Sequence, residues 1–355
     1  SGMQPLLSDL ADRERRSLGR ICAFLDPERV FLHHVQRLLE MDPFFTGKDR
    51  EIITEVLYGY AKFIQRVPYL KDEWCPPGEL RQNHTTFLGL SQYYARSYFY
   101  ERFGLSEFDD MIPFYQRAFA GQAAGYRPND DAGGGVYVPL APVYTHSYLM
   151  ALDDSTNVRS GQQAKTADLI VAITDNMRLP VSFGDVGKYS PSKNGYFIRK
   201  LEDNILSTAA WFTKDGQYQW VSRWKGDSGQ ASIENISLGL YASSVPAAAP
   251  KRFLGVFPVI ADAPVLQWSA LRSFTHSEIA KSGRTYLDKL SFRAAFDPER
   301  EYLLLDGLST FAHGHMDGNT VCRLTWKNRI WLFDLDYIKT TPQYHNGIMV
   351  VKDGV

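Results

Sequence analysis

The sequence has few cysteines, no long apolar run and almost no net charge, and each scarcity excludes a class of protein. The three cysteines, Cys22, Cys75 and Cys322, lie far apart without a CxxC spacing, so they predict neither a disulfide framework nor a thiolate zinc site. No stretch approaches the roughly 18 apolar residues of a membrane-spanning helix, so we expect no membrane span. The net charge of -1 argues against duplex nucleic acid as a partner.

Aromatic residues, by contrast, are plentiful, with 20 tyrosines and 7 tryptophans. Most of them belong to a large core, although aromatic clefts also suit sugars. The length of 355 residues exceeds what one core usually serves and predicts two domains. No secretory signal is visible, and Ser1-Gly2 before Met3 resembles a scar of tag removal, so the sequence leaves the location open.

The first two-thirds of the chain favour helices, because apolar residues recur at helical spacing. The predicted helices lie at 51–67, 84–103, 144–152, 161–177 and 195–212. Turn-forming residues separate them, as in Cys75-Pro-Pro-Gly78 and Gly133-Gly-Gly135. Successive antiparallel helices of this length are typical of a helical toroid or solenoid.

The character of the sequence changes at a predicted linker, residues 244–250. Short β-rich runs follow at 253–260, 265–271, 287–295, 302–305, 320–326, 330–333 and 348–351. They predict an antiparallel sandwich, and hence a helical domain over 1–245 and a β domain over 251–355. A sheet cut after the last run would expose an edge, so we expect the sandwich to be truncated at the C-terminus.

Histidines and carboxylates gather in the β region. His313 and His315 stand two residues apart, and Asp334, Asp336 and His345 follow. Two imidazoles and one carboxylate are a common ligand set for zinc or a similar divalent ion. The same residues would also suit polar loops.

Two further segments lie on the helical side. Asn83-His84 stands at a predicted helix start, where capping alone would explain Asn83. Tyr144 and Tyr148 are four residues apart on a predicted helix, where packing would explain them, and His146 lies between them.

Taken in order, these segments resemble the heparinase II/III-like polysaccharide lyases. On the β side the resemblance lies in 302–307, in His313-Gly-His-Met-Asp317, in the strand ending at Asp334 and in His345-Asn346 before a Val-rich strand. On the helical side it lies in Asn83-His84, in Tyr144 about sixty residues later and in 180–185. It extends from about residue 80 to the end, and oligo-alginate lyases and dermatan sulfate epimerases share the layout.

The resemblance implies an incomplete (α/α) toroid followed by an antiparallel β-sandwich, with the active site in the cleft between them. It implies that Tyr144 is the catalytic base or acid and that His313 is its partner across the cleft. Asn83 and His84 would bind the substrate carboxylate.

The resemblance also implies a Zn²⁺ site formed by His315, Asp334 and His345, in a structural or supporting role. Asp336 is the alternative carboxylate ligand. The metal site would tie together the segments that carry the catalytic histidine and would fix the orientation of its side chain.

The substrate implied is a polysaccharide or oligosaccharide that contains uronic acid, and His146, Tyr148 and Tyr344 would help to bind it. Tyr337 is the alternative to Tyr344. Heparinase II-like members have a glutamate where this chain has Phe87, which argues against that enzyme's substrate range. The resemblance favours a periplasmic or secreted protein, and a homodimer is one possible assembly.

The implied reaction is β-elimination, in which a base removes the C5 proton of a uronate and the 4-linked sugar leaves. Donors such as Asn83 and His84 would hold the carboxylate as charge moves onto it. A tyrosine with a pKa near 10 needs a cationic neighbour to act as a base, and His84, His146 or an arginine would qualify. The alternatives are a uronyl C5-epimerase, a silent glycan-binding protein and a helical-plus-β protein whose histidines have no role.

Overall fold

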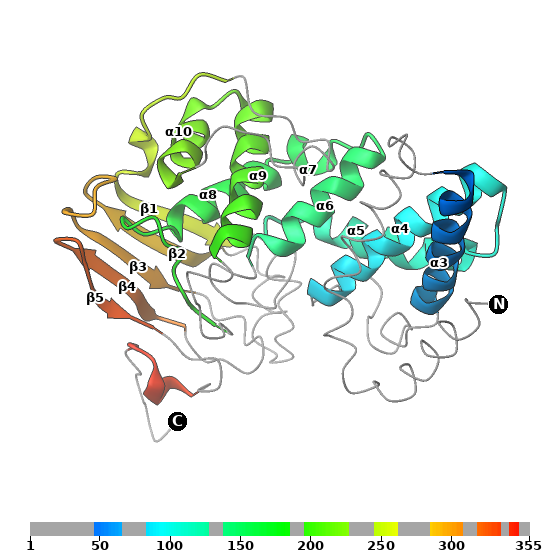
Figure 1. The fold of residues 1–355 in the computed structure, drawn as a ribbon. Helices are drawn as coiled ribbons and strands as arrows, with labels where there is room; N and C mark the ends of the chain where they lie inside the picture. The colour runs from blue at the N-terminus through cyan, green and yellow to red at the C-terminus, as the bar shows by residue number, and fades with distance from the viewer. Residues whose placement is uncertain are drawn as a thin grey trace. The chain divides into compact units, whose positions relative to one another are not determined.

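The computed structural model describes residues 46–65, 83–127, 138–184, 195–226, 245–261, 285–307, 318–334 and 341–347. Helices come first along the chain and strands follow (Figure 1). The helices are α3 (Gly47–Gln65), α4 (Asn83–Phe103), α5 (Ile112–Ala123), α6 (Leu140–Ala151), α7 (Thr156–Arg159), α8 (Gln162–Ala172), α9 (Gly195–Thr213) and α10 (Gly216–Lys225). The strands are β1 (Gly255–Ala261), β2 (Tyr286–Arg293), β3 (Tyr302–Asp306), β4 (Thr320–Trp326) and β5 (Arg329–Phe333).

The predicted combination of helices with an antiparallel sheet is confirmed. The chain divides into two compact units, residues 1–80 with 84–120 and residues 81–83 with 121–355. The predicted domain boundary at 245–251 stays a prediction. No helix in the described ranges is long and apolar enough to cross a membrane.

The first unit contains α3, α4 and most of α5. A reciprocal pair of hydrogen bonds between Thr46 and Asp49 caps the start of α3, which satisfies backbone N–H groups that have no partner inside the helix. Helix α3 buries Leu57, Ala61 and Ile64 on one face. Aromatic rings then fill the space between elements, as where Tyr58 meets Phe99 and Phe108 edge-on.

The second unit carries the remaining helices and the sheet. Helix α8 packs on β1 and β2. It ends at Ala172, five residues before the predicted end, because Asp175 starts a tight turn. The Asp175 carboxylate accepts the N–H groups of Met177 and Leu179, which competes with further helix.

The five strands form one antiparallel sheet in sequence order, β1-β2-β3-β4-β5. The predicted strands 253–260, 287–295, 302–305, 320–326 and 330–333 correspond to β1 to β5 within a few residues. The predicted strands 265–271 and 348–351 lie outside the described residues.

The two faces of the sheet have unusual polarity. On the face toward α8, Lys289, Ser291 and Arg293 of β2 are buried beside Tyr302 and Arg323 of β3 and β4. The opposite face is apolar and more exposed. Its residues pair across the sheet in one row, Val256, Phe292, Leu303, Leu324 and Leu332.

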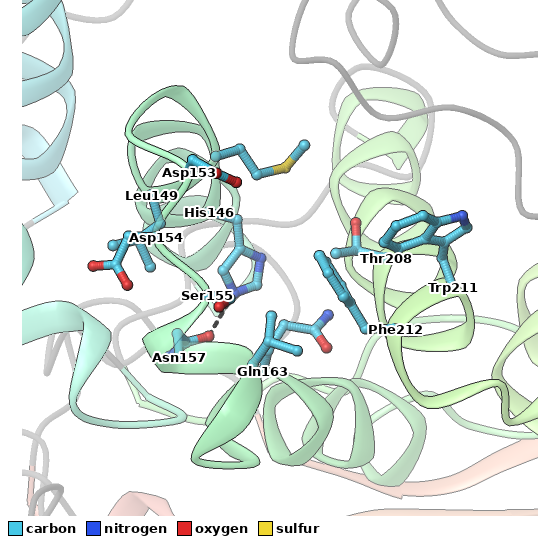
Figure 2. Close-up of a pocket in the computed structure, with 12 residues that line it drawn as sticks. His146, Leu149, Asp153, Asp154, Ser155, Asn157, Gln163, Thr208, Trp211 and Phe212 are labelled. Atoms are coloured by element: carbon cyan, nitrogen blue, oxygen red, sulfur yellow. Dashed lines mark hydrogen bonds between the residues drawn. The ribbon is translucent and has the colours of Figure 1, made fainter.

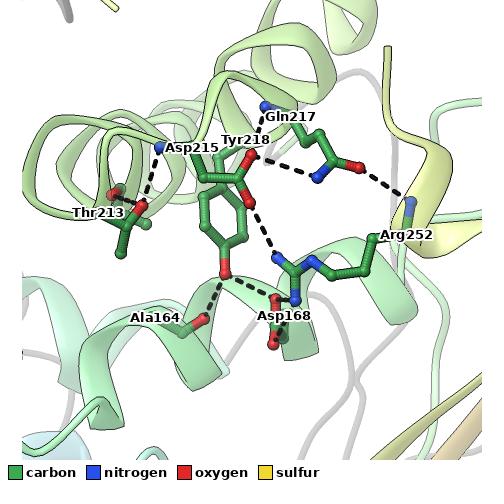
Figure 3. A network of polar contacts seen from close by, with 8 residues as sticks. Ala164, Asp168, Thr213, Asp215, Gln217, Tyr218 and Arg252 are labelled. Atoms are coloured by element: carbon green, nitrogen blue, oxygen red, sulfur yellow. Dashed lines mark hydrogen bonds and ion pairs between the residues drawn. The ribbon is translucent and has the colours of Figure 1, made fainter. Parts of the chain in front are cut away.

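Polar contacts fix the connection into the sheet (Figure 3). Arg252, just before β1, pairs with Asp168 of α8 and with Asp215 at the start of α10. Tyr218 of α10 donates to Asp168 at 2.7 Å, and the Arg252 guanidinium lies 5.2 Å from the centre of its ring. These contacts join the chain before β1 to two helices.

The sequence analysis did not predict α5, α7 or α10, although Trp220, Val221 and Trp224 recur at helical spacing in α10. Capping residues mark both of its ends. The Asp215 carboxylate accepts the N–H of Gln217, and Gly226 ends the helix in a left-handed conformation at φ 103°. Gly216 is required, because an added Cβ would lie 2.2 Å from the carbonyl oxygen of Pro246.

We expect Asp215→Ala to lower the free energy of unfolding by about 1 kcal/mol, because it removes the helix cap. Asp215→Asn keeps a capping oxygen and loses only the charge that faces Arg252, so it is the matched control and should retain most of the stability. Chemical denaturation of the three proteins measures the difference. Equal stability of Asp215→Ala and wild type would show that the cap contributes nothing.

Candidate functional site

Two of the three predicted metal ligands come together in the structure. Asp334 follows the last residue of β5, and His345 follows a 3-10 helix, Pro342–Tyr344. The Nδ1 atom of His345 lies 3.1 and 3.0 Å from the two carboxylate oxygens of Asp334. Both side chains are buried, with 3% and 4% of their surfaces exposed. A predicted pair eleven residues apart in sequence is therefore in direct contact.

Backbone contacts hold this pair in place. The N–H of Asp334 donates to the carbonyl of Cys322 at 2.9 Å, which extends the pairing of β4 with β5. Asn346 donates its side-chain amide to the carbonyl of Phe333 at 3.2 Å, and its own carbonyl accepts the N–H of Val321. Asn346, which directly follows His345, is therefore bonded to both β4 and β5.

The donor set fits a divalent ion in part. A carboxylate and an imidazole are ordinary zinc ligands, and two donor atoms about 3 Å apart can share one ion. Within the part of the chain that the structure describes, no group of three His, Cys, Asp or Glu side chains could hold a metal. The third predicted ligand, His315, the catalytic candidate His313 and the alternatives Asp336 and Tyr337 lie outside the described residues.

We expect His345→Ala to lower both the bound zinc and the melting temperature, because metal binding contributes folding free energy. Asn346→Ala should weaken the site less, since it removes a support and no ligand. Elemental analysis and thermal unfolding, each with and without a chelator, measure the two quantities. If the chelator shifts the melting temperature of wild type and His345→Ala equally, this pair does not bind the metal.

The predicted catalytic tyrosine lies on α6. This helix is buried from Leu140 to Leu149, so nearly every side chain on it has protein around it. Tyr144 and Tyr148, four residues apart, project from the same face and are 7% and 4% exposed. Thr145 and Ser147 donate to backbone carbonyls one turn earlier, which keeps their hydroxyl groups satisfied.

His146 projects from another face of the same helix. Two residues correspond to a rotation of about 200°, so His146 points roughly opposite to Tyr144. It lines a pocket formed by α6, α7, α8 and α9 (Figure 2). Tyr144 is not among the residues that line this pocket, and the two predicted site residues therefore face different surroundings.

The His146 ring is neutral at physiological pH. Burial lowers its pKa from 6.5 to about 4, and the bond with Asn157 offsets this only in part. His146 Nε2 lies 3.2 Å from Asn157 Oδ1, while the Asn157 amide nitrogen donates to the carbonyl of Ala123. Since Asn157 Oδ1 can only accept, Nε2 carries the proton and Nδ1 a lone pair. A neutral ring cannot be the cation that would activate Tyr144.

This shift in pKa makes stability depend on pH. Below pH 6.5 the unfolded chain protonates His146 and the folded chain does not, so the stabilisation is complete above pH 6.5 and is lost as pH falls toward 4. The gap between 6.5 and about 4 corresponds to roughly 3 kcal/mol. We expect His146→Gln, which does not titrate, to lose less stability than wild type over this interval. Denaturation at several pH values measures the difference between the two proteins, and parallel curves would contradict the assignment.

The other predicted site residues are placed as follows. Asn83 and His84 form the first turn of α4, and the structure describes their backbone only. Tyr344 lies in the 3-10 helix beside His345 and is half exposed. Their predicted roles in substrate binding stay predictions.

Sequence reasoning missed a buried charge cluster. Asp288 accepts hydrogen bonds from Tyr126, Arg127 and Lys289, each at 2.7 Å, and Lys289 also pairs with Asp306. Burial by itself raises the pKa of Asp288, but Arg127 and Lys289 outweigh it and lower the pKa to about 2. The sequence signal was a pair of charged residues inside an apolar strand pattern, Leu287-Asp-Lys-Leu290.

No protein-family profile matches this chain, and no curated protein matches it significantly.

Proposed function

We propose that the protein is a polysaccharide lyase that cleaves a uronate-containing glycan by β-elimination. The observation that carries this proposal is the contact between Asp334 and His345. The order of motifs that resembles the heparinase II/III-like lyases predicts both residues as metal ligands, and they lie 3.0 Å apart and buried. The contact supports the proposed ligand set.

The proposal assigns the chemistry to the residues of this chain. Asn83 and His84 hold the substrate carboxylate, and donors there stabilise the enediolate as the C5 proton leaves. If the leaving group lies on the same side of the ring as the C5 proton, Tyr144 takes the proton and then protonates the leaving oxygen. If it lies on the opposite side, His313 takes the proton and Tyr144 protonates the leaving oxygen. His315, Asp334 and His345 would hold a zinc ion, which would supply a fixed positive charge and orient the segment carrying His313.

Catalysis by Tyr144 requires a particular orientation of its hydroxyl group. Its side chain is buried, so the hydroxyl has to face the substrate cleft for the reaction to occur. Because His146 is neutral, the cation that lowers the pKa of Tyr144 has to be His84 or an arginine.

We also propose that the helices belong to an incomplete (α/α) toroid and that the sheet is one layer of a sandwich. The apolar row from Val256 to Leu332 supports the second point, because such a face normally packs on another layer. Because 63% of Val256 and 37% of Phe292 are exposed, this face has room for a second layer.

The test is the near-ultraviolet absorbance of the unsaturated uronate product during incubation with alginate, heparan sulfate, chondroitin sulfate and their oligosaccharides. A rise with one polymer supports the lyase and identifies its substrate. A flat trace with deuterium uptake at C5 from solvent indicates the epimerase instead. A flat trace without uptake leaves a silent glycan-binding protein and contradicts the proposal.

We expect Tyr144→Phe to lower turnover by at least ~10²-fold while the fold persists, because only one hydroxyl is lost. Tyr100→Phe, which removes a half-exposed hydroxyl on α4, is the matched control and should retain activity. Initial rates on the identified substrate, with circular dichroism of each variant, measure the effect. Wild-type turnover in Tyr144→Phe would show that this tyrosine is not catalytic.

A further inference from the structure

The pocket beside His146 has a volume of about 260 Å³ and opens between the helices (Figure 2). Its lining residues come from α6 to α9 and the turn after α6. They are His146, Leu149, Met150, Asp153, Asp154, Ser155, Asn157, Val158, Gln163, Thr208, Trp211 and Phe212. All of them belong to the second unit, so the pocket does not depend on how the two units are arranged.

Three residues that line the pocket each carry a buried polar atom with no hydrogen-bond partner among the described residues. These atoms are His146 Nδ1, Gln163 Oε1 and Thr208 Oγ1, on side chains that are at most 5% exposed. Buried polar groups are nearly always satisfied, so three of them in one cavity indicate a missing partner. The first two atoms are acceptors, because Asn157 fixes the proton on Nε2 of His146. Their partner therefore has to donate at least two hydrogen bonds.

Two aromatic rings form an apolar corner of the pocket. The centres of Trp211 and Phe212 lie 4.7 Å apart, and their planes cross at 85°. Trp211 is half exposed and stands at the edge, as Figure 2 shows, while Leu149 and Val158 add aliphatic surface. Such a corner suits the C–H face of a small ring.

The charges of the pocket limit its ligand further. Asp153 and Asp154 belong to the lining, and none of the lining residues in the described ranges is lysine or arginine. Lys214 lies over the Trp211 ring, with its Nζ atom 4.6 Å from the centroid, but it does not line the cavity. A free carboxylate would meet two carboxylates there, so the pocket disfavours uronates.

We propose that this pocket binds an uncharged sugar or polyol, whose hydroxyl groups donate to His146 Nδ1 and Gln163 Oε1 and pair with Thr208. One face of the ligand packs on Trp211 and Phe212. This site is separate from the proposed elimination site, because His146 and Tyr144 project from opposite faces of α6. The inference stands whether or not the protein is a lyase.

The experiment is a ligand-observed NMR titration of the full chain, which detects weak binding. The probes are the methyl glycosides of glucose, galactose and mannose, the polyol glycerol, the anion glucuronate and the cation glucosamine. We expect a neutral probe to bind more tightly than glucuronate. Tighter binding of glucuronate or of glucosamine would overturn the assignment to an uncharged ligand.

Thr208→Val is the decisive variant, because it removes the hydroxyl and keeps the shape of the side chain. We expect it to weaken binding of the neutral probe roughly tenfold, the value of about one hydrogen bond. Thr213→Val on the same helix is the matched control, since the Thr213 hydroxyl donates to Ala209 outside the pocket. It should leave the affinity unchanged.

Stability without ligand provides a second readout. The Thr208 hydroxyl has no hydrogen-bond partner to lose among the described residues, so Thr208→Val should leave the melting temperature unchanged or raise it. A lower melting temperature together with unchanged affinity would mean that internal water satisfies these atoms, and the proposal would be wrong. Absence of binding by every neutral probe would overturn it as well.

Discussion

The packing of the second unit depends on the buried carboxylate of Asp288, which joins the sheet to the segment after α5. The register of β1 and β2 shifts between Val259 and Ile260, where Lys289 and Leu287 find partners and Asp288 is left out of the ladder. A bulge of this kind redirects a side chain, and Asp288 meets Tyr126 and Arg127 from the segment after α5. Removing it would leave Arg127 and Lys289 as buried cations without their main partner, which costs far more than a surface pair.

The polar inner face of the sheet follows from this arrangement. Arg293 and Arg323 join the sheet to the end of α8 and the turn after it, and Lys289 pairs with Asp288 and Asp306 of the sheet itself. These charged residues occupy the positions that apolar side chains normally take. Arg293 donates to the carbonyls of Val171 and Thr174 and to Asn176, which fixes the end of α8. The apolar side chains of the strands consequently lie on the opposite face, where a second layer would cover them.

Two faces of helix α6 have different surroundings. Tyr144 and Tyr148 project from one face, and the neutral His146 projects from another into a pocket with buried acceptors and two carboxylates. The charge of a site determines which substrates it admits, so an anionic glycan and a neutral sugar would bind to different faces of this helix. The contact of Asp334 with His345 adds a third element, in which Asn346 holds a loop on two strands.

The sequence by itself determined what depends on local spacing. Apolar periodicity predicted α4 at 84–103 and β4 at 320–326, and the observed elements are Asn83–Phe103 and Thr320–Trp326. The motif order also selected Asp334 and His345, while the roles of His313 and His315 stay predictions. Only the tertiary structure decided what depends on distant partners. Gly307 is required because Leu287, twenty residues earlier, leaves no room for a Cβ. His146 is neutral because four helices remove it from water, and no pattern along the chain records that burial.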